Sequence, residues 1–426
     1  MTEAQAVCLL NDSFPPIIDG VSNAVLNYAN NLHQAGKRAI VITPSHPEAE
    51  DTGFPYPVIR YPSLNFRKMD GYVAGVPFSL ETARNLAGEQ VALLHSHCPI
   101  MSTFLARELR QIKKAPIVLT YHTKFDVDIE NVVKNQKLQD TCKKALVSNI
   151  SACDEVWVVS KGAGENLRQL GYEGNYIIMP NGVDLPHERV PDMVANCVAG
   201  SAGIPSEMPV FLFVGRMMWY KGIRIILDAL SMLKKNGKAF RMVFVGDGAD
   251  RVEIERYAEA CGLGDVCLFT GTILNREKLR GWYCRADLFL FPSTFDTNGL
   301  VVGEAAANDL ASVLIKDSCA AENVSDGING FLIEENAQAL FALLDRIYGK
   351  RKFLRTVGAT AGRDLYVSWS DAVKMASARY EVVIERYLRG DCIRNKNPMD
   401  GVMKINGELM ETLAKLSEFR RNRPLK

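Results

Sequence analysis

The sequence lacks the features that would direct a protein to an oxidising compartment, through a membrane or onto nucleic acid. Its ten cysteines include no C-x-x-C pair, which favours reduced, mostly buried thiols. No apolar run approaches the roughly 20 residues that cross a bilayer, and the polar start, Met1 to Ala6, does not resemble a secretory signal. The formal net charge of +1 attracts no nucleic acid. We expect a cytoplasmic protein, and a peripheral position at the inner membrane face is compatible with this composition.

A dinucleotide-binding fingerprint is also missing. The first predicted strand, Val7–Leu10, leads into a loop without the G-x-G-x-x-G pattern. Gly20 nevertheless opens a predicted helix soon after that loop. The exposed N–H groups at a helix start favour an anion, so Gly20 is a candidate binding residue. An ordinary turn glycine is the alternative.

The order of apolar segments predicts an α/β fold. At 426 residues the chain is too long for one ordinary core. Short apolar runs alternate with helical periodicity, which is typical of parallel sheets with helices on both faces. A first series of predicted strands comprises Val7–Leu10, Ala39–Thr43, Ala92–Leu94, Ile117–Tyr121, Glu155–Val159 and Tyr176–Met179. A second comprises Val210–Val214, Arg241–Val245, Val266–Thr270, Leu288–Phe291 and Ala311–Ile315.

These two series predict two doubly wound, Rossmann-like domains that face a cleft. We place the first at 1–184 and the second at 185–370, and we expect no regular element in 185–207. A helix at 371–390 is predicted to pack back on the first domain. Residues 391–426 read as a linker and an amphipathic helix, with apolar positions from Val402 to Phe419. That helix could pack on the protein, on a second copy or on a membrane.

Cations and glycines follow two strands of the second domain. Gly215-Arg216 comes after Val210–Val214, and Lys221-Gly222 precedes the next predicted helix. An arginine fork and a lysine point charge both suit phosphate oxygens. Gly246-Asp247-Gly248 makes another tight turn at the same sheet edge. Two solvated surface cations are the alternative reading of Arg216 and Lys221.

Two acids flank the start of a later helix in the same domain. Asp296 follows the strand Leu288–Phe291, and Glu304 lies about a turn into the helix that starts near Asn298-Gly299-Leu300-Val301. Carboxylates there can accept hydrogen bonds from sugar hydroxyls, and the helix amides can hold phosphate. Helix capping by Asp296 or Asn298 is the alternative, but it leaves Glu304 unexplained.

Metal sites find little support in the sequence. His95-Ser96-His97 could mimic a metal pair at the end of a strand, but no third ligand accompanies it. Asp126-Val127-Asp128 matches a short D-x-D pattern of metal-dependent transferases, which have a different fold. We expect no metal and no cofactor.

Together these motifs resemble the family-4 retaining glycosyltransferases of GT-B architecture, over about residues 5–388. The resemblance rests on the Gly20 loop and on six further elements: Tyr121-His122-Thr123, Pro180-Asn181-Gly182-Val183-Asp184, Gly215-Arg216, Lys221-Gly222, Gly246-Asp247-Gly248 and the Asp296…Glu304 pair. A narrower likeness, in 121–126 and 292–297, is to bacterial enzymes that glycosylate diacylglycerol-type lipids.

The resemblance assigns a role to each candidate. Arg216 and Lys221 would bind the diphosphate of a nucleotide sugar, such as UDP-glucose or UDP-galactose, and Glu304 would bind its ribose. Asp296 would face the transferred sugar and His122 would act on the acceptor side. The remaining donor-binding candidates are Gly20, Gly246, Asp247, Asn298, Gly299, Leu300 and Val301. The implied partners are a nucleotide sugar, a lipid acceptor and an anionic membrane surface.

Two departures from the family pattern stand out. Asp296 replaces a more usual glutamate, and Asn308-Asp309-Leu310-Ala311 replaces a Gly-x-Pro turn. Two other functions stay open at this point: a sugar-nucleotide epimerase of similar architecture, and a non-catalytic nucleotide-sugar-binding subunit.

Overall fold

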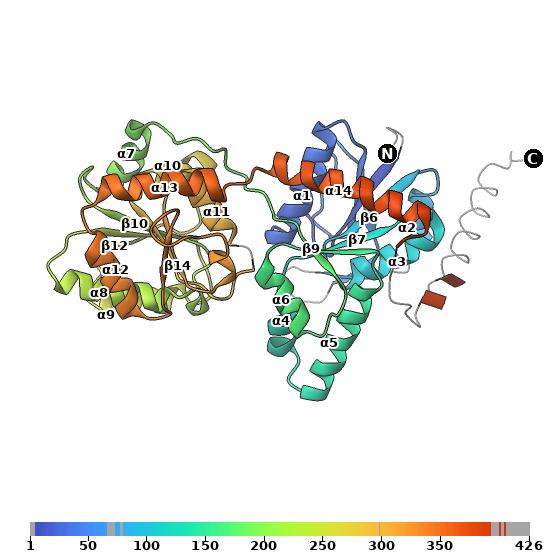
Figure 1. Ribbon diagram of the computed structural model, residues 1–426, viewed down its shortest axis with the longest axis horizontal. Coiled ribbons are helices and arrows are strands. Elements are labelled where there is room, and N and C mark those ends of the chain that lie inside the picture. The colour runs from blue at the N-terminus through green and yellow to red at the C-terminus, as the bar shows by residue number, and fades with distance from the viewer. Residues whose placement is uncertain are drawn as a thin grey trace, which may run out of the picture. The chain divides into compact units, whose positions relative to one another are not determined.

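The chain forms two units, and the first of them is discontinuous in sequence. The computed structural model describes residues 5–65, 73–76, 80–297, 299–392, 400–401 and 404–405. Unit 1 combines the residues up to Pro180 with those from Trp369 onward, and unit 2 spans Asn181–Ser368. The division at Pro180 falls beside the Pro180–Asp184 segment that separates the two predicted series of strands (Figure 1).

Unit 1 is built on a seven-stranded parallel sheet in the order β3-β2-β1-β6-β7-β8-β9. Almost every residue of its central strands is buried, as in a sheet covered on both faces. The strands are β1 (Ala6–Leu10), β2 (Ala39–Pro44), β3 (Val58–Tyr61), β6 (Val91–Ser96), β7 (Ile117–Tyr121), β8 (Glu155–Val158) and β9 (Tyr176–Ile178). A small antiparallel pair, β4 (Ser63–Asn65) and β5 (Val73–Gly75), stands beside this sheet.

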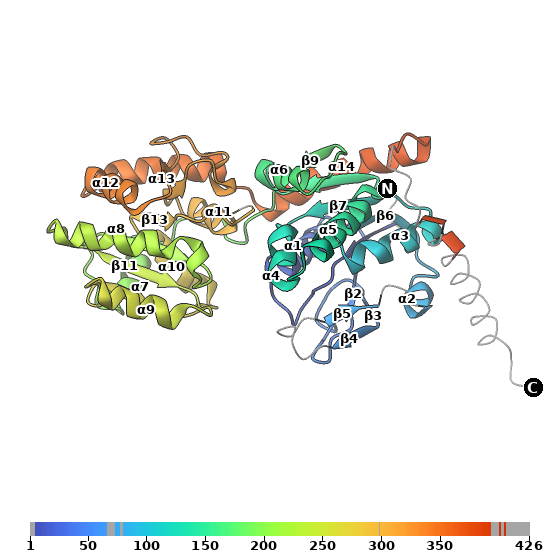
Figure 2. The same cartoon turned by 90° about the horizontal axis from the view of Figure 1, so that it is seen from below.

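The helices of unit 1 lie on both faces of this sheet (Figure 1, Figure 2). They are α1 (Gly20–Gln34), α2 (Leu80–Asn85), α3 (Met101–Lys113), α4 (Phe125–Val132), α5 (Gln136–Ser151), α6 (Lys161–Gln169) and α14 (Trp369–Arg389). Asp19 starts α1 with a capping box: its carboxylate accepts from the amides of Val21 and Ser22 at 2.8 and 2.7 Å, and the Ser22 hydroxyl accepts from the Asp19 amide. This box fixes Gly20 as the first residue of α1.

Helix α14 completes unit 1 although it comes after unit 2 in the chain. The Tyr380 hydroxyl lies 2.6 Å from His95 Nδ1, and its ring stacks on Trp157 at 5.4 Å between centroids. The Arg379 guanidinium donates to both oxygens of Glu155, at 2.9 and 2.6 Å. The expected helix 371–390 therefore belongs to the core of unit 1.

Unit 2 repeats the architecture with a six-stranded parallel sheet, in the order β12-β11-β10-β13-β14-β15. Its strands are β10 (Val210–Val214), β11 (Arg241–Val245), β12 (Cys267–Phe269), β13 (Leu288–Phe291), β14 (Ser312–Ile315) and β15 (Phe331–Ile333). Its helices are α7 (Asp192–Gly200), α8 (Ile223–Lys235), α9 (Arg251–Ala260), α10 (Arg276–Arg285), α11 (Leu300–Ala307), α12 (Ala337–Ile347) and α13 (Arg351–Leu365), with short 3-10 turns at Trp219–Lys221 and Cys319–Ala321.

The predicted class, an α/β fold with two doubly wound domains, is confirmed, with one local correction. The stretch 185–207 is not irregular throughout, because α7 forms within it, and Ala195 and Ala199 of α7 are buried. Only short apolar side chains mark that buried face, so the periodicity is weak. The predicted tail helix from Val402 to Phe419 lies almost entirely outside the described residues.

Candidate active site

Each of the strands β10 and β11 ends in a turn that depends on glycine. Gly215 and Gly246 have φ angles of 155° and 132°, in the region that side chains rarely adopt. A Cβ on Gly246 would lie 2.0 Å from the Gly215 carbonyl oxygen, and one on Gly248 would lie 2.5 Å from the Met217 carbonyl oxygen. The two turns therefore pack backbone against backbone and leave an edge without side-chain bulk.

Gly222 allows a similar close approach between the backbone after β13 and the start of α8. Its φ is 76°, and an added Cβ would lie 2.0 Å from the Pro292 carbonyl oxygen. This close approach brings the residue before it, Lys221, to the segment that follows β13. Two motifs that are far apart in the sequence thus meet at one sheet edge.

Lys221 and Asp296 form an ion pair at that edge. Lys221 Nζ lies 2.6 Å from Asp296 Oδ1, and the Ser293 hydroxyl donates to Asp296 Oδ2 at 2.6 Å. The Lys221 side chain is only 8% exposed, and the rings of Tyr220, Phe291 and Phe295 lie 5.6 to 5.9 Å from its ammonium group. A buried ammonium group with one carboxylate partner is suited to bind a second anion.

The other predicted donor residues of this edge lie closer to solvent. The Arg216 side chain is exposed. Asp247 is also exposed, and its pKa is lowered first by the amide of Gly248 and then by Arg251. Its carboxylate lies 3.1 Å from Arg251 Nη1. Asn298 lies outside the described residues.

Glu304 lies on α11, whose start is set by Gly299 in the left-handed region (φ 59°). The Tyr283 hydroxyl donates to Glu304 Oε2 at 2.8 Å, and Arg276 Nη1 lies 3.5 Å from Oε1. Burial raises the pKa of the Glu304 carboxyl group, while Tyr283 and Arg276 oppose the shift. Leu300 and Val301 precede the first intrahelical bond, which Val302 N donates to the Gly299 carbonyl oxygen, so their amides are helix-start donors.

The unusual turn after α11 is well formed. Asp309 adopts a left-handed conformation (φ 52°), which aspartate tolerates better than most residues. The buried Asn308 amide donates to the Glu304 carbonyl oxygen at 2.9 Å, and Asp309 Oδ1 lies 3.1 Å from His187 Nε2. These contacts take the place of the Gly-x-Pro sequence and keep α11 in position.

The unit 1 candidates also follow the carboxyl ends of strands. A Cβ added to Gly20 would meet no atom within 4 Å, so the space beside the start of α1 is open. His122 follows β7 and is buried. Burial lowers the pKa of His122 to about 4, and the Asp19 carboxylate opposes this shift. His122 is therefore a neutral imidazole at neutral pH.

Two family models match the sequence and between them cover most of it. The Glycosyltransferase Family 4 model matches residues 18–186, and the Glycosyl transferases group 1 model matches residues 199–363. Among curated proteins, the alpha-monoglucosyldiacylglycerol synthase of Acholeplasma laidlawii is 24% identical over 79% of this chain and 86% of its own length. This chain is a family-4 glycosyltransferase.

Other similarities show how wide this family is. A GDP-mannose-dependent alpha-mannosyltransferase of Mycobacterium tuberculosis is 27% identical to this glycosyltransferase over 71% of this chain and 77% of its own length. The structure of a sucrose-phosphate synthase from Thermosynechococcus elongatus aligns with a TM-score of 0.71 at 21% identity, over 89% of this chain and 99% of that one. The GT-B fold is therefore confirmed, and the family assignment favours a transferase over an epimerase.

Several partners of the site residues carry no signal in the sequence of the glycosyltransferase. Ser293 holds Asp296, Tyr283 holds Glu304, and His97 Nδ1 lies 3.0 Å from His122 Nε2. Each joins elements that are brought together only by the fold. The His95-Ser96-His97 pattern offers His97 for metal binding, but the structure places it against another imidazole.

Within the described part of the chain, no group of three His, Cys, Asp or Glu residues could hold a metal ion. Asp126 Oδ2 accepts instead from the Asn166 amide at 2.9 Å, and the Asp128 side chain lies outside the described atoms. None of the described helices is long and apolar enough to cross a membrane.

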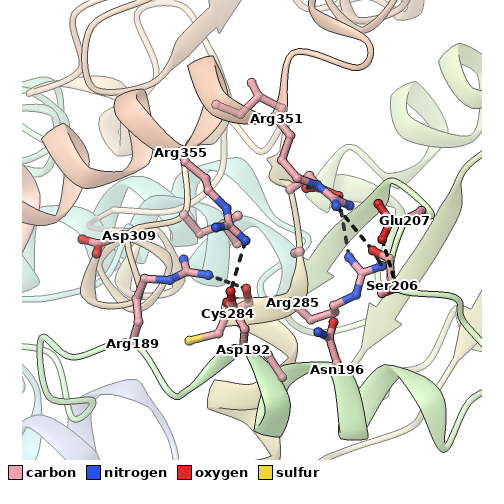
Figure 3. A pocket seen from close by; sticks show the side chains of 15 residues that line it. Arg189, Asp192, Asn196, Ser206, Glu207, Cys284, Arg285, Asp309, Arg351 and Arg355 are labelled. Carbon is pink, nitrogen blue, oxygen red and sulfur yellow. Dashed lines mark hydrogen bonds and ion pairs between the residues drawn. The ribbon is translucent and has the colours of Figure 1, made fainter.

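A polar pocket of about 170 Å³ lies elsewhere in unit 2 (Figure 3). Three of its lining residues come shortly before strands in the sequence: Glu207 before β10, Asp287 before β13 and Asp309 before β14. Arg351 donates to both oxygens of Asp287, at 2.5 and 3.1 Å. This pocket is at the amino ends of the strands, whereas Lys221 and Asp296 are at the carboxyl ends.

Proposed function

We propose that this glycosyltransferase transfers a hexose, from UDP-glucose or UDP-galactose, to a hydroxyl group of diacylglycerol or a glycolipid, with retention of anomeric configuration and without a metal ion. The observation that carries the donor assignment is the buried Lys221 ammonium group at a sheet edge cleared by glycines. Ligands of doubly wound sheets bind beyond the carboxyl ends of the strands.

Donor activation follows from the charges at this edge. When the bond between the anomeric carbon and the diphosphate breaks, negative charge develops on the departing diphosphate. Lys221, Arg216 and the amides of Leu300 and Val301 would stabilise that charge, which is commonly a large term in catalysis. They would also take the place of a divalent cation.

Retention of configuration is best explained if the acceptor hydroxyl attacks the anomeric carbon from the side of the leaving group. The acceptor hydroxyl would form the new bond to the anomeric carbon as the phosphate bond breaks, and its proton would pass to a phosphate oxygen. Asp296 is tied to Lys221 and Ser293, which supports a role in orienting the donor rather than in forming a covalent intermediate. His122 would contact the sugar from the acceptor side.

A lipid acceptor is supported by the relative from Acholeplasma laidlawii, which is named for monoglucosyldiacylglycerol. Lys134 and the lysines of helix α5 in unit 1, Lys137, Lys143 and Lys144, add positive charge beside the half-exposed Leu138. Lys143 is paired with Glu130 at 2.6 Å, which leaves Lys137 and Lys144 as the main cations of the helix. Near an anionic surface each such cation contributes about 1 kcal/mol.

The sequence also offers an aromatic and basic mixture, Tyr61, Phe66, Arg67 and Lys68, for this surface. Tyr61 is fully buried, which removes it from the surface, and the other three lie outside the described residues.

The test is a transfer assay with purified protein. UDP-glucose, UDP-galactose and GDP-mannose are each offered with diacylglycerol in anionic vesicles, with and without EDTA, and the product anomer is read by NMR. We expect an α-glycolipid from one UDP-sugar in both conditions. Loss of activity in EDTA that manganese restores would refute the metal-independent mechanism, and a β-product would refute retention.

Membrane binding is tested separately by vesicle flotation. We expect the protein to float with anionic vesicles and to stay behind with neutral ones. If it binds neither, and a water-soluble acceptor is glycosylated efficiently, the lipid acceptor is wrong while the transferase assignment stands. An epimerase would convert the sugar nucleotide without any acceptor.

A further inference from the structure

Three buried imidazoles form a row in unit 1 that ends at His122. The His95 and His97 ring centroids are 4.0 Å apart, and His97 and His122 are stacked at 5.3 Å with 22° between their planes. His97 follows β6 and His122 follows the neighbouring strand β7. Their closest nitrogens, His97 Nδ1 and His122 Nε2, are 3.0 Å apart, a hydrogen-bond distance.

All three rings are neutral near pH 7. Burial is the main cause that lowers the pKa of His95 and of His97 well below the ordinary value, and it lowers the pKa of His122 to about 4. A neutral imidazole carries one N–H donor and one bare acceptor nitrogen. The bond between His97 and His122 therefore contains a single proton, and its position fixes the tautomer of both rings.

The surroundings of His97 distinguish the two arrangements. His97 Nε2 is buried and has no hydrogen-bond partner. If His122 donated, the proton of His97 would have to sit on this nitrogen, and buried N–H groups without a partner are rare and costly. If His97 donates from Nδ1, its Nε2 carries only a lone pair and no N–H group is left without a partner.

We propose that His97 Nδ1–H donates to His122 Nε2 and thereby holds His122 in the tautomer that carries its proton on Nδ1. His97 is then a positioning residue for the acceptor-side histidine, an inference that rests on the proposed function of His122. With Nε2 accepting this bond, the ring proton of His122 is on Nδ1 and no bare ring nitrogen remains.

The packing around His97 holds it in this orientation. The Tyr28 ring of α1 meets the His97 ring at 5.1 Å and 63°, and it meets Trp369, the first residue of α14, at 5.8 Å. Tyr28 is buried. The orientation of the His97 ring thus depends on α1 and α14 as well as on the sheet.

The tautomer can be measured directly. In protein labelled with ¹⁵N at its six histidines, long-range ¹⁵N–¹H correlation spectra distinguish Nδ1–H from Nε2–H rings, and the signal missing in His122→Phe assigns His122. We expect His122 to be protonated on Nδ1 in the wild type. His97→Phe keeps an aromatic ring but has no donor. In this variant we expect the ¹⁵N chemical shift of His122 Nε2 to move to the value of a nitrogen without a hydrogen bond. His97→Asn places an amide donor near the same point and should restore the wild-type shift.

Kinetics separate positioning from packing. His97→Phe should lower kcat roughly 10- to 100-fold, as misplacement of a reacting group does, with the KM of the nucleotide sugar unchanged and partial recovery in His97→Asn. Tyr380→Phe is the control, because it removes the bond to His95 but not the one between His97 and His122; it should leave kcat and the His122 spectrum unchanged.

Two results would overturn the proposal: a wild-type His122 protonated on Nε2, or a His97→Phe enzyme with wild-type kcat. If the wild type transfers no sugar from any nucleotide sugar, the proposed function fails. In that case the ¹⁵N spectrum still tests whether His97 donates to His122, independently of the proposed function.

Discussion

At the scale of single residues, the proposed donor site of unit 2 is centred on the ion pair between Lys221 and Asp296. Lys221 faces one carboxylate, Asp296, and is otherwise surrounded by aromatic rings. This pairing offsets the cost of burying the ammonium group. A diphosphate would add two further anionic partners to the same nitrogen.

Removal of Lys221 should therefore affect turnover more than folding. We expect Lys221→Ala, and likewise Arg216→Ala, to lower kcat by about 10²–10³, the usual effect of losing a charge-stabilising donor. Steady-state kinetics measure this, and Lys235→Ala, an exposed lysine at the other end of α8, is the control. Near-normal turnover in both site variants would remove them from the donor site.

Glu304 should make nucleotide binding depend on pH. Burial raises its pKa, and a ribose hydroxyl is bound best by the ionised form. The affinity for the nucleotide should therefore be highest at pH values above that raised pKa and should fall as the pH decreases through it. Glu304→Ala should weaken nucleotide binding by about 1.5–3 kcal/mol. The same variant should also lose the pH dependence of binding. Calorimetry with the nucleotide alone measures both.

Tyr283→Phe is a second test of the role of Glu304 in the pH dependence of binding. The Tyr283 hydroxyl bond lowers the pKa of Glu304, so its loss should move the midpoint of the pH dependence upward. An unchanged midpoint would show that another group controls it.

At the scale of elements, the loops depend on glycines for different reasons. Gly222 and Gly237 flank α8 with nearly equal φ angles of 76° and 73°. A Cβ at Gly222 would strike the Pro292 carbonyl oxygen, whereas one at Gly237 would meet nothing within 4 Å. The same substitution at the two ends therefore separates backbone strain from steric exclusion.

We expect Gly237→Ala to cost only the strain of a left-handed alanine, about 1–2 kcal/mol, and to leave activity intact. Gly222→Ala should cost more and should abolish most transfer, because Lys221 can no longer reach Asp296. Thermal unfolding and kcat are the measurements. Equal stability losses in the two variants would contradict this account.

The elements themselves were largely predictable, and the contacts between them were not. Strands such as β10 and β13 are apolar on both faces, which marks them in the sequence. Three-residue β15 and helix α7, whose buried residues are alanines, carry too few apolar residues for a periodic signal. The pairs Lys221–Asp296, Tyr283–Glu304 and His97–His122 span 75, 21 and 25 residues. Motif spacing named one or both members of each pair, but only folding joins them.

For the whole molecule, the decisive feature is that α14 belongs to unit 1. The Glu155 side chain, 8% exposed, accepts both bonds of the Arg379 fork and one from Trp157 Nε1 at 2.7 Å. Arg379→Ala would leave this carboxylate without its main partner. We expect a loss of about 1–3 kcal/mol that is confined to unit 1.

Calorimetry can show this if the two units unfold in separate transitions. Only the transition of unit 1 should move in Arg379→Ala. Arg389→Ala, on the same helix with an exposed partner in Glu385, should move neither, because exposed pairs contribute about 0–1 kcal/mol. A shift of the unit 2 transition would contradict the assignment of α14.

The discontinuity of unit 1 also sets an order of events on the ribosome. Domains usually fold as they emerge, the N-terminal one first. Here Ser368 completes unit 2 before a single residue of α14 has been synthesised. Until then Trp157, His95 and Tyr28 lack the partners that Tyr380 and Trp369 provide. The second unit is thus the first that can finish folding, and the side chains of unit 1 that α14 covers stay uncovered until α14 has been synthesised.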